Sequence, residues 1–182
     1  MVLSSLIALS VAAASPSTGA CPTQPEPAAL TSAAFTVPSS GETLMFSAAP
    51  SFRSVRYALR VFRPSGARVG SALLIRLKRR LDCNVDDRTG EWTFTLSPTE
   101  TDALFAAAAD LERHGDDPNS IVLDGTSIQL SRYTAGKLVF NYSSNGLAKE
   151  RLSKLVLDTM RQHVRADELP RSADWSYRAP GN

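Results

Sequence analysis

Two runs of residues that alternate between the faces of a strand, joined by one short turn, constrain the fold of this chain more than any other feature. In the first run, Val55, Tyr57, Leu59 and Val61 alternate with Arg56, Ala58, Arg60 and Phe62. The second run places Ser71, Leu73, Ile75 and Leu77 on one face. Pro64, Ser65 and Gly66 lie between them and are typical turn residues. A period of two on both sides of a turn is the pattern of a β-hairpin, so we expect an antiparallel sheet.

Further strands are expected on both sides of this hairpin. Thr43–Ser47 is predicted to be an edge strand, and Glu91–Leu96 alternates Trp92, Phe94 and Leu96 with polar residues. Three short strands follow later in the chain, at Ile121–Leu123, Ser127–Tyr133 and Lys137–Tyr142. Asp124-Gly125 and Thr134-Ala135-Gly136 separate them, which predicts a meander.

Two helices are predicted from their ends and their apolar spacing. Ser97-Pro98-Thr99-Glu100 combines an N-cap serine, a proline at the first helical position and a capping-box glutamate, and this helix is expected to end at about His114, before Gly115. The second helix is predicted from Leu147 to about Arg165. Its apolar face holds Leu152, Leu155, Val156, Met160 and Val164.

The order of these elements predicts an α+β fold. We expect an antiparallel sheet of about five to seven strands packed by two helices, in the order ββββαβββα. The sequence contains no βαβ unit with phosphate-binding glycines, which argues against a parallel α/β sheet.

The N-terminus predicts export. Val2–Ala14 is apolar and uncharged, has the length of a signal-peptide core, and is too short to span a bilayer. Ala12-Ala13-Ala14 fits a small-residue cleavage site, although no Lys or Arg precedes the apolar run. We therefore interpret residues 1–20 as a signal peptide, which would make the mature protein secreted, periplasmic or associated with the bacterial envelope.

Cys21 has two competing interpretations. Export permits a disulfide with Cys83, which would close a loop of about 60 residues. Alternatively, Thr18-Gly19-Ala20-Cys21 resembles a lipobox, although Thr18 stands where a large aliphatic residue is usual. In that case Cys21 would be lipidated and would be the only link to the membrane. The sequence leaves both interpretations open, together with the alternative of two free thiols, and Cys21 cannot be both disulfide-bonded and lipidated.

Composition divides the rest of the chain into three parts. Residues 21–40 are rich in Pro, Ser and Thr, which is typical of a linker that cannot bury enough surface to order itself. Residues 41–166 form the expected single α+β domain, a comfortable size for one core. Residues 167–182 are expected to form a polar C-terminal tail.

Few residues suit catalysis or metal binding. The chain has only two His and two Cys, and His114 and His163 have no ligand partner at helical spacing, so we expect no metal and no cofactor. No Gly-x-Ser-x-Gly elbow is present. The carboxylates of Glu91, Asp102 and Asp124 are the remaining candidates for acid–base chemistry, and Asp124 lies beside a turn.

Basic residues gather in one part of the chain. The net charge is only +2, yet residues 53–88 contain ten basic and three acidic side chains, a net charge of +7. Arg56 and Arg60 share one face of the first hairpin strand, and Arg76 and Lys78 share one face of the second. We expect these four side chains to form a basic binding surface on the hairpin.

The expected function is binding. In an exported protein, a basic surface suits an acidic protein or an anionic envelope component such as lipid headgroups or cell-wall polymer. No aromatic RNA-binding motif or recognition helix accompanies it, which argues against nucleic acid. We therefore expect an exported, non-catalytic protein that binds a macromolecule, for example an inhibitor or immunity-type protein. The alternative is a small envelope hydrolase that uses carboxylates near Asp124 and Glu91.

Overall fold

The computed structural model describes residues 35–50, 55–80, 85–115, 126–144 and 149–170. The elements are β1 (Glu42–Pro50), β2 (Val55–Arg63), β3 (Gly70–Arg80), β4 (Val85–Leu96), α1 (Pro98–His114), β5 (Thr126–Thr134), β6 (Lys137–Ser144), α2 (Lys149–His163) and the short 3-10 helix η2 (Ala166–Glu168).

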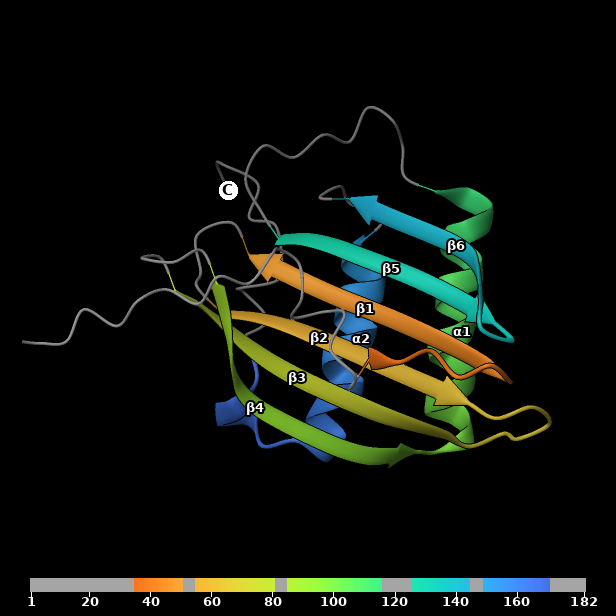
Figure 1. The fold of residues 1–182 in the computed structure, drawn as a ribbon, viewed down its shortest axis with the longest axis horizontal. Helices are drawn as coiled ribbons and strands as arrows, with labels where there is room; N and C mark the ends of the chain where they lie inside the picture. Colours follow the sequence, from red (N-terminus) through yellow and green to blue (C-terminus); the bar gives the residue numbers. More distant parts are fainter. Residues whose placement is uncertain (1–34, 51–54, 81–84, 116–125, 145–148, 171–182) are drawn as a thin grey trace, which may run out of the picture.

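One antiparallel sheet, with both helices on the same face, forms the fold (Figure 1). Its strand order is β4-β3-β2-β1-β5-β6. The predicted α+β class, the antiparallel sheet and the two helices are thereby confirmed. The hairpin is also confirmed as β2 and β3, joined through Pro64-Ser65-Gly66. Ile121–Leu123, the first strand of the predicted meander, lies outside the described residues.

The position of β1 corrects the sequence interpretation. Thr43–Ser47 was expected at an edge of the sheet, but β1 pairs with β2 on one side and with β5 on the other. Its two faces explain this position, because Leu44 and Phe46 face the helices and are only 4% exposed, while Thr43 on the opposite face is 1% exposed. Met45 and Ser47, on the same face as Thr43, are partly buried, so β1 is covered on both sides to different degrees, as expected of a central strand.

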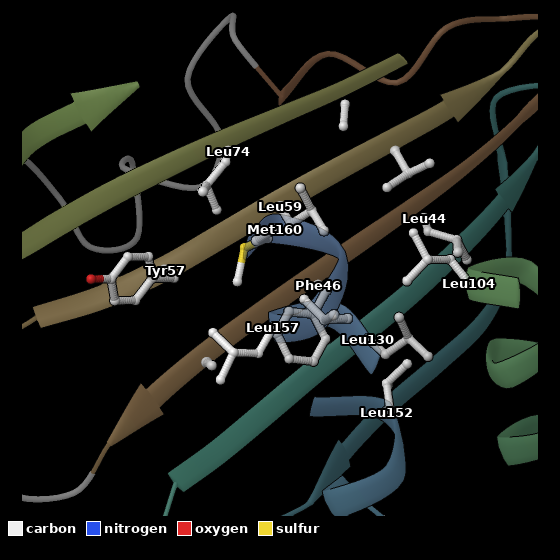
Figure 2. Close-up of a cluster of buried hydrophobic side chains, with 14 of the residues drawn as sticks. Leu44, Phe46, Tyr57, Leu59, Leu74, Leu104, Leu130, Leu152, Leu157 and Met160 are labelled. Atoms are coloured by element: carbon white, nitrogen blue, oxygen red, sulfur yellow. The ribbon is translucent and has the colours of Figure 1, made fainter. Parts of the chain in front are cut away.

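The main core fills the space between the sheet and the helices. From the strands it takes Leu44, Phe46, Tyr57, Leu59, Leu74, Leu96, Ile128 and Leu130, and from the helices Leu104, Phe105, Leu111, Leu152, Val156, Leu157 and Met160. Figure 2 shows strand residues such as Phe46 and Leu130 pointing toward Leu152 and Leu157 of α2. The predicted apolar face of the last helix is therefore its buried face.

The start of α1 follows the sequence prediction. The Ser97 hydroxyl accepts from the backbone amide of Glu100, and the Glu100 carboxylate accepts from the backbone amide of Ser97, which completes the capping box. Thr101, one residue further, accepts a hydrogen bond of 3.0 Å from the backbone amide of Gly70. A Cβ on Gly70 would lie only 3.0 Å from that threonine oxygen, so the glycine permits the close approach of α1 to β3.

Arg63 also fastens α1 to the sheet. Its Nη2 lies 2.5 Å from Oε2 of Glu42 on β1, and its Nη1 lies 3.0 Å from Oδ1 of Asp102 on α1. The guanidinium also lies 4.2 Å above the ring centre of Phe105. One side chain of β2 thus contacts both its neighbouring strand and the helix, and Asp102 serves as its ion-pair partner.

Candidate functional site

Strand alternation divides the predicted basic residues between the two faces of the sheet. Tyr57, Leu59 and Val61 point into the helix-side core, so Arg56 and Arg60 project from the opposite face, called here the open face. The prediction that these two arginines share a face agrees with the strand geometry. Both side chains are partly exposed.

An apolar cluster lies beside these arginines on the open face. It consists of Phe35, Ala58, Leu73, Ile75 and Leu77, with Met45 packed against it. Phe35 precedes β1 and is only 6% exposed, and the segment that leads from it into β1 passes over the open face in Figure 1. The sequence placed residues 21–40 in a linker and gave no indication that Phe35 packs on the sheet.

The segment that contains Phe35 also contacts one of the arginines. Nη1 of Arg60 donates a hydrogen bond of 3.1 Å to the backbone carbonyl of Thr36. Two adjacent residues are therefore bound by the open face: Phe35 packs in the apolar cluster, and the carbonyl of Thr36 accepts a hydrogen bond from Arg60.

The second predicted pair lies on the helix side. Arg76 follows Leu74 at strand spacing, and Lys78 pairs with Val55, which packs against the helix-side core. The four basic residues therefore do not form one surface. Lys78 is exposed, whereas Arg76 is 25% exposed and occupied by contacts within the protein.

Arg76 joins three parts of the fold. Its Nη1 lies 2.6 Å from Oε2 of Glu168 in η2, and its Nε and Nη2 donate to the side chain and backbone of Thr89 on β4. Its guanidinium lies 5.6 Å from the ring centre of Trp92, and Tyr57 donates to the backbone carbonyl of Glu168. These contacts hold η2 against the edge of the sheet, which makes Arg76 a structural residue in this arrangement.

The carboxylates considered for catalysis do not meet among the described residues. Glu91 lies on β4 opposite Ile75, which places it on the open face, where it forms an ion pair with Arg88. Asp102 binds Arg63 on the helix side. Asp124 lies outside the described residues, as do Cys21 and Cys83, so the disulfide and the lipid anchor stay predictions.

A contact between Glu100 and His163 escaped the sequence analysis. Nε2 of His163 lies 2.8 Å from Oε1 of Glu100, and the histidine ring stacks on Phe94 with a centroid separation of 4.5 Å. Burial raises the pKa of Glu100, but hydrogen bonds from the side chain and backbone of Ser97, together with the hydrogen bond and charge of His163, lower it overall. The Ser97 hydroxyl bonds the carboxylate of Glu100, so this cluster lacks the serine–histidine contact of a nucleophilic site.

Two features are absent from the described residues. No group of three or more His, Cys, Asp or Glu in that part of the chain is arranged to hold a metal ion. Within the same ranges, neither helix combines the length and the apolar character needed to cross a membrane.

Comparison with known proteins gives no match. No protein-family model fits the sequence, and neither a curated protein nor a solved structure is significantly similar to the chain. The candidate site must therefore be judged on its own geometry.

Proposed function

We propose that this chain is an exported, non-catalytic protein that binds another macromolecule of the bacterial envelope through the open face of its sheet. The observation that carries the proposal is the position of Arg56 and Arg60, which project from one strand beside the apolar cluster formed around Phe35. The export itself rests on the apolar, uncharged run in residues 1–20 of the sequence.

The charge of the open face favours an acidic partner. The charged side chains described there are Arg56, Arg60, Arg88 and Glu91, and the last two form an ion pair with each other. The basic side chains of this face that we assign to binding are therefore Arg56 and Arg60 of β2. Guanidinium groups bind carboxylates and phosphates with two parallel hydrogen bonds, and a neighbouring apolar surface strengthens such bonds by excluding water.

We favour a protein with an acidic surface over a lipid or polymer. The apolar cluster beside the arginines is itself buried, with Ile75 1% and Leu77 4% exposed, so it holds β2 and its arginines in place. Arginines held at a fixed spacing suit the carboxylates of a folded protein better than mobile lipid headgroups. An inhibitor or immunity-type protein, which neutralises an enzyme of the envelope, is the form of this function that fits a small single domain. Binding to vesicles of anionic lipid and to soluble cell-wall polymer is measured for comparison with binding to the protein.

Charge reversal tests this proposal. The double variant Arg56→Glu/Arg60→Glu and the single variant Arg68→Glu are compared with the wild type, because Arg68 is an exposed arginine in the loop of the same hairpin. We expect the wild type and Arg68→Glu to retain the same acidic envelope protein after cross-linking, and the double variant to lose it. Wild-type binding to anionic vesicles alone would contradict the choice of a protein partner.

The double variant requires a folding control. Arg60 contacts Thr36, so its replacement could loosen the segment around Phe35 as well as reverse the charge. Unfolding curves of all three proteins separate these effects. Equal capture by a folded double variant would show that Arg56 and Arg60 do not form the binding site.

A further inference from the structure

The two edges of the sheet differ in how well they are protected against pairing with another strand. β4 forms one edge and carries the charged residues Asp87, Arg88 and Glu91. Both edge strands contain a register shift, between Arg76 and Leu77 in the β3–β4 pairing and between Arg132 and Tyr133 in the β5–β6 pairing, so charge is what distinguishes the two edges. Charges on an edge strand help to prevent a sheet from extending into another molecule.

β6 forms the other edge and carries far less charge. Among the described strands it pairs only with β5. Leu138 and Val139 are 55% and 46% exposed, and the part of the chain that the structure describes has one other large apolar side chain with such exposure, Val69. Lys137, at the beginning of β6, is the only charged residue in this strand. An apolar edge strand with so little charge is well suited to pair with a further strand.

We propose that β6 pairs antiparallel with β6 of a second copy of this chain, which joins the two six-stranded sheets into one continuous sheet. A contact between identical strands in opposite directions is self-complementary and closes at two copies. The charge on β6 favours this direction, because antiparallel pairing puts the two Lys137 side chains at opposite ends of the contact. Parallel pairing would place them side by side, where like charges repel.

The side chains of β6 also suit a symmetric register centred on Asn141. In that register Phe140 lies opposite Tyr142 of the second copy, and Tyr142 lies opposite Phe140 of the second copy. Phe140 and Tyr142 both pack against the helix-side core, and their rings within one copy are stacked 6.3 Å apart. Pairing would therefore produce two aromatic cross-strand contacts on the same face of the joined sheet.

The contact is small, and this sets the expected strength of the dimer. A single strand of eight residues contributes the whole edge, so the interface falls among the small, transient ones. The self-association should therefore depend on concentration. The edge contact does not cover the open face of either copy, so dimerisation and binding at the open face would be independent.

Sedimentation velocity of the full mature chain, over about a hundred-fold range of protein concentration, tests the proposal. We expect a reversible monomer–dimer equilibrium in the wild type. Val139→Lys adds a charge to the exposed part of β6 and should shift the midpoint at least about ten-fold toward higher concentration. Thr93→Lys is the matched control, because it adds the same charge to an exposed position of the opposite edge strand.

Hydrogen exchange locates the contact. Backbone amides of β6 should exchange more slowly at high protein concentration in the wild type and in Thr93→Lys, but not in Val139→Lys. Unfolding curves establish that the variants are folded. A monomer at every concentration, equal dimerisation of the wild type and Val139→Lys, or equal loss in both variants would each overturn the proposal.

Discussion

Nε2 of His163 lies 2.8 Å from Oε1 of Glu100, although 63 positions separate these two residues in the sequence. His163 ends α2, and Glu100 lies in the first turn of α1. The imidazole also stacks on Phe94 of β4, with an angle of 9° between the ring planes. One histidine thus connects the two helices with the sheet, and it does so at the carboxylate that caps α1.

This contact predicts that stability depends on the charge of Glu100. Its pKa is lower in the folded protein than in the unfolded chain, so the stabilisation is fully present above the unfolded pKa and disappears as the pH falls through the folded one. We expect Glu100→Gln to be less stable than the wild type at neutral pH. The difference should shrink in acid, below the usual glutamate pKa of about 4.3. Urea unfolding across this pH range measures it.

His163→Phe provides the control for this prediction. It keeps a ring that can stack on Phe94 but removes the hydrogen bond to Glu100, so it should weaken the acid dependence while the bonds from Ser97 maintain part of it. If the free energies of unfolding of the wild type and Glu100→Gln differed by the same amount at every pH, the ionised carboxylate of Glu100 would not contribute to stability.

The sequence predicted the elements of this fold better than their partners. The β2–β3 hairpin and the cap of α1 depend on residues close together in the chain, and both were identified correctly. The central position of β1 depends on what packs on its second face, which local alternation does not show. The same holds for Arg76, because strand spacing gave its face but not the η2 contact that occupies it.

Two glycines with the same backbone conformation should respond differently to substitution. Gly41 and Gly66 both have φ of +74°. A Cβ on Gly41 would lie 2.4 Å from the backbone carbonyl oxygen of Arg63, whereas nothing lies within 4 Å of a Cβ on Gly66. We expect Gly66→Ala to lower the free energy of unfolding by about 1 kcal/mol, the usual cost of a left-handed alanine. Gly41→Ala should cost at least about 2 kcal/mol because β1 or β2 must also move.

Urea unfolding of the two variants checks this pair directly. Gly66→Ala measures the cost of the backbone conformation, and the excess in Gly41→Ala measures the close contact between the start of β1 and the end of β2. Equal losses in the two variants would mean that the backbone around Gly41 yields without cost.

Arg76 should affect stability more than Lys78, although the two lie on the same face of β3. Arg76→Ala removes the partly buried ion pair with Glu168 and two exposed hydrogen bonds to Thr89. We expect a loss of about 2 kcal/mol in the free energy of unfolding. Lys78→Ala, at an exposed position, should change it by less than about 0.5 kcal/mol. Chemical unfolding compares the two variants. An unchanged free energy of unfolding in Arg76→Ala would contradict the structural role assigned to this residue.

Cys21 gives the prediction that decides where the protein resides. Purified from the envelope fraction of a bacterial host, the mature chain should start after the signal peptide. A chain that starts near Ser15 and gains two hydrogen masses on reduction would contain the Cys21–Cys83 disulfide. A chain that starts at Cys21 and carries acyl mass would be a lipoprotein. Retention of Met1 would contradict export.

The stability of Cys83→Ala distinguishes the two forms of Cys21 independently of mass. A disulfide that closes a loop of about 60 residues stabilises the folded state by roughly 3 to 4 kcal/mol in the chain-entropy model, so its loss should lower the melting temperature of the oxidised protein clearly. Addition of a reductant should lower the wild-type value to that of Cys83→Ala. If Cys21 is lipidated instead, the reductant should leave the wild-type melting temperature unchanged, because Cys83 then has no cysteine with which to pair.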